Sequence, residues 1–305
     1  MGDYRTLNRT ILAKVEGTSG TDASATVGSN AVLGENPQTT PGIGTLNTNE
    51  VTGALDARAP IPGGGPGNHS MLVNLHGSGA GGTAPEWDPY LQACGFAGAN
   101  LAADLTGTAS AGAAGTITLA DATGVTIGQV IVTTGGTGAG QTRVITGLAT
   151  LVASVYPNWT VTPDATTTYA VKASETYAPA SASLVTASIY DYFHSSSGAN
   201  SELRKVLGWA GGAAFTLPVG GIAQAQFTGQ GKWTTPANVA HPGAATFQAQ
   251  RPVAFMGADI SLDSVATKFN QLTFDCGNQV QAAPDPSDTY GIDVGGITRR
   301  QINGR

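Results

Sequence analysis

The chain has 305 residues, of which 41% are hydrophobic and 11% charged, whereas an average soluble domain carries about 25% charged residues. Its 20 acidic and 14 basic residues give a formal net charge of −6, which leaves no basic stripe of the kind that grips a DNA duplex. Two cysteines are too few for a secreted disulfide scaffold. These counts argue against a protein that grips a DNA duplex and against a disulfide-rich domain. If the protein contacts nucleic acid, we expect the contact to be weak and without sequence recognition.

The 43 glycines do not indicate disorder, because the segments around them alternate apolar and polar residues and contain aromatics, as packed strands do. We therefore expect a folded, mainly β protein. A surface this low in charge is typical of a subunit that its neighbours largely cover. It also fits a soluble domain whose surface is made of Thr, Ser and Asn, so composition favours assembly and leaves the second interpretation open.

No segment is apolar enough for a signal peptide or a membrane span, so we expect synthesis in the cytoplasm and no contact with a membrane. Cys94 and Cys276 lie in patterned segments, where a thiol serves as a small core residue. Both are expected to be buried and free. The four histidines lie far apart and have no zinc-like spacing to either cysteine, so neither a metal site nor a cofactor is expected.

Residues 1–50 are rich in Gly, Thr and Asn and predict an arm with one short strand near 10–15. Segments 50–58 and 70–76 alternate as strands do, and the prolines and glycines of the loop 59–68 forbid regular structure between them. The pattern predicts a long hairpin with this loop at its tip.

Alternation assigns two faces to the strand 70–76. Met71, Val73 and Leu75 fall on one face, which is expected to meet the core. Polar residues of this strand, with two from the strand expected before it, fall on the far side of the sheet. The residues assigned to this far side are Glu50, Thr52, Ser70, Asn74 and His76.

A single short helix is predicted within 83–95. Thr83 and Glu86 have the spacing of a capping box, and Gly95 suits the left-handed conformation that ends a helix. Pro89 would distort the helix and keep it short. The side chains expected to point inward are Trp87, Leu91 and Cys94.

Residues 104–173 differ in character, because short strands follow one another at intervals marked by turns. This predicts a small all-β module inserted into the main body. A three-stranded antiparallel meander begins at residue 182, and two further strands are expected over 270–281 and 290–303. The main body then consists of 1–103 and 174–305.

Two glycine-rich segments are similar to catalytic motifs. LVNLHGSGAGG (72–82) is similar to the oxyanion-hole segment of α/β-hydrolases, and His76 with Ser78 suggests a base and a nucleophile, but the chain has no G-x-S-x-G elbow. GGTGAGQT (135–142) matches a phosphate loop except that Gln141 replaces the lysine, and a strand-like segment follows it. Both are predicted to be turns, and the protein is predicted not to be an enzyme.

Four ordered blocks resemble the major tail tube proteins of siphophages, the bacteriophages with long non-contractile tails. ILAKVEGTSGTDASATVGSNAVL is similar to the opening segment of that family. The most specific block is GSGAGGTAPEWDPYLQACGFA. It combines a glycine turn, Thr-Ala-Pro, a helix and an Ala-Cys-Gly-Phe step, which occur together in that family. VLGWAGGAAFTLPVGGIAQAQFTGQGKW and FNQLTFDCGNQVQ resemble its meander and its late Asp-x-Gly-Asn strand. Residues 104–173 fall outside the match.

The resemblance implies a two-sheet antiparallel β-sandwich with one short α-helix, six copies of which form a ring with an inner β-barrel. Stacked rings would form a channel for double-stranded DNA, lined by the far side of the strand 70–76. The resemblance also implies a place in the virion tail beside the tape measure, terminator and distal tail proteins. The arm 1–50 and the loop 59–68 would be ordered by neighbouring rings, and the module 104–173 would face outward.

Two other classes stay open. A surface β module, such as an adhesin or fibre domain, would share the Gly- and Thr-rich, weakly charged sandwich. Repeats of the module or a secretion signal would favour that class, and the sequence has neither. An α/β-type hydrolase is the second alternative, and the missing nucleophile elbow argues against it.

Overall fold

The computed structural model is mainly β, with 51% of residues in strands and one short helix, which confirms the expected class. The chain divides into two compact units. Unit 1 comprises Met1–His76, Glu86–Phe96 and Ala180–Arg305, and unit 2 comprises Gly77–Pro85 and Ala97–Pro179. The residues that the structure describes are 4–48, 50–51, 58–195, 198–257, 261–262, 265–266 and 268–304.

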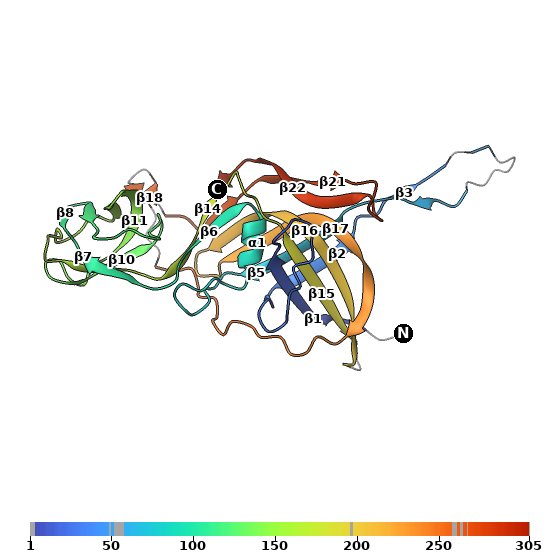
Figure 1. The fold of residues 1–305 in the computed structure, drawn as a ribbon, viewed down its shortest axis with the longest axis horizontal. Coiled ribbons are helices and arrows are strands. Elements are labelled where there is room, and N and C mark those ends of the chain that lie inside the picture. Colours follow the sequence, from blue (N-terminus) through green and yellow to red (C-terminus); the bar gives the residue numbers. More distant parts are fainter. Residues whose placement is uncertain are drawn as a thin grey trace. The chain divides into compact units, whose positions relative to one another are not determined.

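An eight-stranded antiparallel sheet forms the frame of unit 1 (Figure 1). Its strand order is β1-β15-β16-β17-β5-β2; β20 pairs with β16, and β23 pairs with β20. The consecutive strands β15, β16 and β17 form the meander expected from the sequence. The strands are β1 (Tyr4–Val15), β2 (Glu35–Pro41), β5 (Gly67–Asn74), β15 (Ala187–Ser195), β16 (Asn200–Pro218), β17 (Gln224–Ala240), β20 (Gln271–Asp275) and β23 (Asn303–Gly304).

β16 has 19 residues, long enough for two partners along one edge. Its first half pairs with β15, up to the pair Ala187↔Trp209. Its second half pairs with β20, from Ala214↔Asp275 to Pro218↔Gln271. Its other edge pairs with β17 throughout. The sheet therefore continues past β16 in two directions, and the described strands close no barrel.

The expected pairing of the strand 70–76 with the segment 50–58 is wrong. β5 pairs with β2 on one edge and with β17 on the other. Between β2 and β5, β3 (Thr45–Leu46) pairs with β4 (Ile61–Pro62), and residues 52–57 of the expected strand lie outside the described residues. The hairpin thus exists, but its first arm lies earlier in the chain. β2 has the sequence ENPQTTP, whose lack of apolar alternation hides it from a periodicity search.

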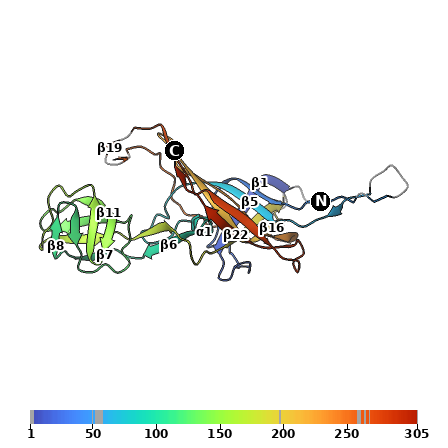
Figure 2. The same cartoon turned by 90° about the horizontal axis from the view of Figure 1, so that it is seen from above.

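A second layer crosses the large sheet. β21 (Asn278–Pro284) and β22 (Ile292–Arg300) form a two-stranded ribbon, and Figures 1 and 2 both show it lying against β16. Gln230 Nε2 donates to the carbonyl of Val280 at 3.0 Å. The expected strand 270–281 is therefore two strands, β20 and β21. Gly277 separates them with a φ of 57°, a conformation that favours glycine. A small ribbon of β18 (Ser261–Leu262) and β19 (Val265–Ala266) precedes β20.

The helix α1 (Asp88–Ala93) covers the core of unit 1. Tyr90 is fully buried, with its ring 5.3 Å from the rings of both Trp209 and Phe227. Pro89 stands in the first turn, where a missing N–H breaks no helical hydrogen bond, so the proline starts the helix instead of distorting it. The expected capping box is absent, since no side chain caps α1.

Two of the blocks that carry the resemblance meet behind α1. Asn278 Nδ2 donates to the carbonyls of Cys94 at 2.8 Å and Gly211 at 2.9 Å. Arg300 donates to Asn278 Oδ1 at 3.2 Å and to the carbonyl of Gly95 at 2.7 Å. The Ala-Cys-Gly and Asp-x-Gly-Asn steps therefore hold the end of the helix onto the sheet. Both cysteines are free and buried, as expected.

Unit 2 contains a seven-stranded sheet of order β7-β13-β10-β11-β12-β9-β8. Its own apolar cluster includes Ile117, Leu119, Ile131 and Ile145, all fully buried. A two-stranded ribbon of β6 and β14 precedes and follows this sheet in the chain. The bounds are β6 (Phe96–Leu101), β7 (Leu105–Thr108), β8 (Ala111–Ala113), β9 (Thr116–Thr118), β10 (Val130–Gly135), β11 (Thr142–Ala149), β12 (Val152–Tyr156), β13 (Thr168–Val171) and β14 (Ser174–Pro179).

The segment 135–142 is the turn between β10 and β11, as predicted, and not a phosphate loop. Gly136, Gly138 and Gly140 have φ values of 70°, 75° and 83°. Gln141, which stands where a phosphate loop has lysine, accepts from the backbone N–H of Thr160 at 2.7 Å and donates to Gly138 O at 2.8 Å. Its amide therefore holds the turn together.

We predict that the seven-stranded sheet can be removed without unfolding unit 1. Asp104 lies just before this sheet in the chain and Ala173 just after it. The two residues are neighbours in space, because Asp104 Oδ1 accepts a hydrogen bond from Ala173 N at 2.8 Å. Replacing residues 105–171 with about four Gly and Ser residues should leave the melting temperature and β signal of unit 1 unchanged by circular dichroism. Loss of cooperative unfolding would show that the module belongs to the core of unit 1.

Candidate assembly surface

One part of the large sheet has a polar face, which spans β2, β5, β17, β16 and β20. Ser70 pairs with Gln38 on one side and with Thr228 on the other, and Asn74 pairs with Gln224. Directly paired residues of antiparallel strands lie on the same side of a sheet, so these side chains share a face. We call the following set the polar face: Glu35, Gln38, Ser70, Asn74, Thr216, Gln224, Gln226, Thr228, Thr273 and Asp275.

Charge on the polar face is sparse and of one sign. Glu35 and Asp275 are its charged members, and the set contains no Lys or Arg. Asn74 Nδ2 donates to Glu35 Oε1 at 2.7 Å, and its Oδ1 accepts from Gln224 at 2.9 Å. The face thus presents amides, hydroxyls and carboxylates. Two apolar residues interrupt it, Leu72 and Ala214.

The opposite side of the same strands is the core. Met71, Val73, Ala225 and Phe227 are all fully buried. The strict alternation of β5 explains this division, since successive side chains point to opposite sides of a sheet. Met71 and Val73 thus occupy the side expected for them.

Three of the five residues assigned to the far side are not placed on the polar face. β5 ends at Asn74, so alternation stops before His76, whose side chain is 4% exposed and lies 3.6 Å from Glu86 Oε1. Glu50 forms an exposed ion pair with Arg58. Thr52 lies outside the described residues. Ser70 and Asn74 are therefore the two that the structure brings together.

Glu86 connects three segments of unit 1. Its carboxylate accepts from Leu33 N at 2.7 Å and from Gln248 N at 3.1 Å, besides facing His76. Ser78, the residue suggested as a nucleophile, donates its hydroxyl to Ala80 O at 2.8 Å. Glu86 and Ser78 therefore each hydrogen-bond to backbone groups of the chain.

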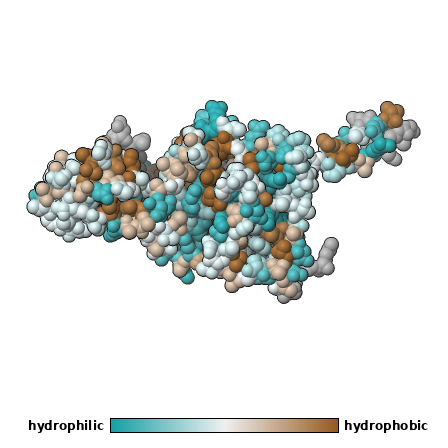
Figure 3. Space-filling model, in the orientation of Figure 1, coloured by the Kyte–Doolittle hydropathy of each residue, from teal (hydrophilic) through white to brown (hydrophobic). Residues whose placement is uncertain are grey.

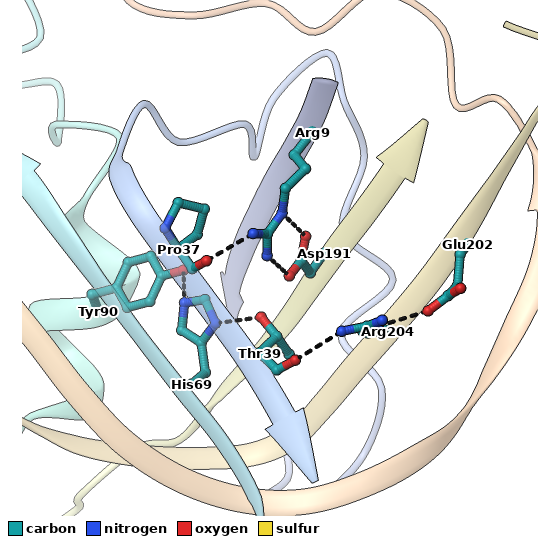
Figure 4. Close-up of polar contacts among 8 residues, drawn as sticks. All are labelled: Arg9, Pro37, Thr39, His69, Tyr90, Asp191, Glu202 and Arg204. Atoms are coloured by element: carbon teal, nitrogen blue, oxygen red, sulfur yellow. Dashed lines mark hydrogen bonds and ion pairs between the residues drawn. The ribbon is translucent and has the colours of Figure 1, made fainter. Parts of the chain in front are cut away.

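Arg9 links the two outermost strands of the sheet path, β1 and β2 (Figure 4). Its Nη1 donates to the carbonyl of Pro37 on β2 at 2.7 Å. Its Nε donates to Asp191 Oδ1 at 3.0 Å, and a second contact makes the pair bidentate. The Asp191 side chain is fully buried. The Arg9 side chain therefore supplies a hydrogen bond from β1 to the backbone of β2.

A second arginine strengthens this link. Arg204 Nη1 donates to the carbonyl of Thr39 on β2 at 3.3 Å, and its Nε donates to Glu202 Oε1 at 2.7 Å. The ring of Phe193 lies between the two guanidinium groups, 4.0 Å from Arg9 and 4.3 Å from Arg204. Both contacts are within the range of cation–π attraction. We call Arg9, Phe193, Arg204 and their carboxylate partners the arginine seam.

A buried histidine lies next to the arginine seam. His69 Nδ1 is 2.8 Å from Thr39 Oγ1, and Nε2 is 3.0 Å from the Tyr90 hydroxyl (Figure 4). Burial, with the nearby positive charge of Arg9, lowers the pKa of His69 to about 3. The imidazole is therefore neutral at physiological pH. Its hydrogen bonds attach β2 and α1 to β5.

The sequence offered weak signals for these residues. Extending the alternation of Met71 and Val73 back by two positions would have placed His69 on the core side. Arg9 and Asp191 each stand within an apolar strand, where a charge needs a partner, but their separation of 182 residues hides the pairing.

A buried carboxylate explains the opening block of the resemblance. Glu16 accepts from Gly20 N at 2.7 Å, Thr186 Oγ1 at 2.6 Å, Ser188 Oγ at 2.7 Å and Gly208 N at 2.8 Å. Four donors satisfy the carboxylate without a cation. The Glu-Gly-Thr-Ser-Gly-Thr-Asp step therefore forms a loop that is closed on β15 and β16.

We predict that replacing Arg9 destabilises the protein far more than replacing an exposed arginine. Arg9→Met leaves the buried Asp191 carboxylate without its cation, which costs about 3–5 kcal/mol of unfolding free energy. The matched control is Arg58→Met, which breaks an ion pair whose side chains are 64% and 53% exposed, and should cost less than about 1 kcal/mol. Urea unfolding measures both, and equal losses would contradict a structural role for the arginine seam.

We predict that His69 makes the fold sensitive to acid. Its pKa is about 3 when folded and about 6.5 when unfolded, so between these values the unfolded chain binds more protons and stability falls as pH falls. From pH 7.5 to 5 the loss is about 2 kcal/mol. His69→Gln, which cannot titrate, should lose correspondingly less in urea unfolding at the two pH values. An unchanged pH slope in this variant would contradict the assignment.

Comparison with known proteins adds no relative to this picture. No model of a known protein family matches the chain, and no curated protein matches its sequence. Among the described residues, no group of three or more His, Cys, Asp or Glu side chains could hold a metal ion. No helix in the same part of the chain has the length and apolarity needed to cross a membrane. A function for the protein must therefore be argued from the polar face and from the ordered sequence blocks.

Proposed function

We propose that the protein is the subunit of a siphophage tail tube, in which copies assemble as hexameric, stacked rings around a channel for double-stranded DNA. The observation that carries the proposal is the polar face, a broad sheet surface with two acidic residues and no cation among its members. In the tube this face lines the channel. The protein acts as a structural part of the virion tail and not as an enzyme.

The chemistry of the polar face suits a wall along which DNA slides. Lys and Arg bind phosphate and release counterions, so a basic wall would hold the duplex. Carboxylates repel phosphate, and amides and hydroxyls interact with it weakly and without sequence preference. A wall made of such groups keeps DNA from adhering during passage.

Exposed apolar side chains outside the polar face support assembly. Leu46 and Ile61 on the β3–β4 ribbon are 60% and 53% exposed, and Figure 3 shows apolar atoms on this ribbon. Val253 and Met256 are 78% and 70% exposed. Such groups commonly mark protein–protein contacts. In the tube, neighbouring copies cover the ribbon, and unit 2 faces outward.

The tube also needs partners at its ends and within it. By the resemblance these are the tape measure protein, the terminator and the distal tail protein, with DNA passing through. A surface adhesin or fibre domain would need no ring, so electron microscopy separates the two functions. Negatively stained purified protein should show rings or tubes with sixfold symmetry. A monodisperse monomer at high concentration, together with virions that lack such a tube, would rule out the proposal.

We predict that one cation on the polar face slows DNA passage without preventing assembly. Thr228 is exposed and pairs with Ser70, so Thr228→Lys places a ring of ammonium groups where the channel wall would be. Tubes should form normally, and DNA ejection from virions should be slower, most clearly at low salt, because screening weakens the attraction.

The matched control is Ser287→Lys, which adds the same charge at an exposed turn. It should leave ejection unchanged. Equal ejection rates for both variants would place the polar face outside the channel while leaving tube formation intact.

A further inference from the structure

We infer that residues 241–248 form a strap whose first end, at residues 241–243, is released when the stacked side chains of His194 and His241 become protonated in mild acid. The inference concerns a change within one subunit, so it does not depend on the proposed assembly into a tube. It follows from how the strap is fastened: two imidazoles hold its first end, and a carboxylate holds its far end.

The strap follows β17 and has no helix or strand of its own. Figure 1 shows it as an orange coil that leaves the end of β17. Ala245 of the strap packs against a small apolar cluster, and Thr246 N donates to Val27 O at 3.0 Å. The buried members of this cluster are Leu12, Ala31, Tyr190 and Leu203. A segment held by a few separate contacts can open locally while the sheet beneath it stays folded.

The first end of the strap rests on a fixed imidazole. The ring of His241 stacks on that of His194, with centroids 4.2 Å apart and planes at 30°. Nε2 of His194 is 2.8 Å from Thr10 Oγ1 on β1, and its Nδ1 is 2.8 Å from Ser201 Oγ on β16. Hydroxyls both donate and accept, so they hold this ring in either tautomer. His194 therefore forms a firm base for His241.

The turn that begins the strap needs a neutral His241. Its Nδ1 accepts a hydrogen bond from Gly243 N at 3.0 Å. A neutral imidazole has one nitrogen that can accept, whereas both nitrogens of a charged imidazole carry hydrogen and donate. Protonation of His241 therefore removes the bond that shapes this turn.

Charge around His194 acts in the same direction. Burial, and then the neighbouring His241, lower the pKa of His194, whereas the negative charge of Asp191 on the same strand raises it. Asp191 is paired with Arg9, and the contacts from β1 and β16 are the two hydroxyls described above. A histidine whose pKa is lowered by folding loses stability as pH falls below its ordinary pKa of about 6.5. Two charged rings in stacked contact would also repel each other.

The far end of the strap responds to acid in the opposite way. Gln248 N donates to Glu86 Oε2 at 3.1 Å, and Glu86 N donates to Gln248 Oε1 at 3.0 Å. His76 Nε2 lies 3.6 Å from Glu86 Oε1, so a proton on His76 adds attraction to the carboxylate. Acid therefore opens the strap at its first end and leaves it attached at Gln248.

Hydrogen exchange at pH 7.5 and pH 5.5 tests the inference, with each rate divided by that of an unstructured chain at the same pH. Mass spectrometry with fragmentation resolves single amides. The amides of Gly243 and Thr246 should lose protection several-fold, up to roughly tenfold, the limit for one histidine of ordinary pKa about 6.5 over this range. The amide of Gln248 and the β17–β5 ladder at residues 224–231 should keep their protection.

Two results would overturn the inference. One is unchanged protection along the strap. The other is an equal loss of protection in the β17–β5 ladder, which would mean that acid unfolds the sheet as a whole and does not open the strap.

Glutamine variants provide a second measurement. His241→Gln cannot be protonated, so the change in protection at Thr246 between the two pH values should shrink to less than roughly twofold. His194→Gln keeps groups that bond to the two hydroxyls and should give a smaller change than the wild type, because the repulsion is absent. The matched control is His76→Gln, which removes a buried histidine at the far end and should keep the full change. A full change in His194→Gln or His241→Gln, or its loss in the control, would contradict the inference.

Discussion

The fold of unit 1 depends on a side-chain contact between the two end strands of its large sheet, β1 and β2, whose described residues do not pair with each other. β1 and β2 end the strand path. Arg9 of β1 donates a hydrogen bond to the backbone of β2, and its charge is balanced by the fully buried Asp191 side chain. A buried ion pair gains little over an apolar replacement, so its main contribution here is geometric. It fixes where β2 lies, and β2 in turn fixes His69, β5 and the polar face.

The sequence predicted the elements whose patterns are local. The meander, the turn at 135–142, the buried cysteines and the core side of β5 follow from alternation and glycine placement within a few residues. β2 was missed because an edge strand with two prolines and mostly exposed polar side chains has no apolar period. The helix is predicted, but the spacing of Thr83 and Glu86 places its start too early, because Pro89 stands in the first turn of the helix.

The candidate site was predictable only in part for a similar reason. Ser70 and Asn74 follow from alternation within one strand, whereas Gln38, Gln226 and Asp275 join the polar face through pairings between distant segments. The end of β5 at Asn74, two residues before His76, does not follow from the alternation, because a strand pattern does not show where the strand stops. The arginine seam depends on contacts across about 180 residues, which no local period encodes.

The place where the chain enters and leaves the seven-stranded sheet has a consequence for how such proteins diversify. Asp104 and Ala173 are joined by a hydrogen bond, and just before and after them Asn100 contacts Glu175 at 2.6 Å. A gene segment bounded by two such neighbouring positions behaves as a cassette. Recombination can exchange it for any domain whose own ends lie close together, because the sequence that folds as unit 1 is unchanged. In the tube proposed above, such an exchange would change the outer surface and leave the channel wall unchanged.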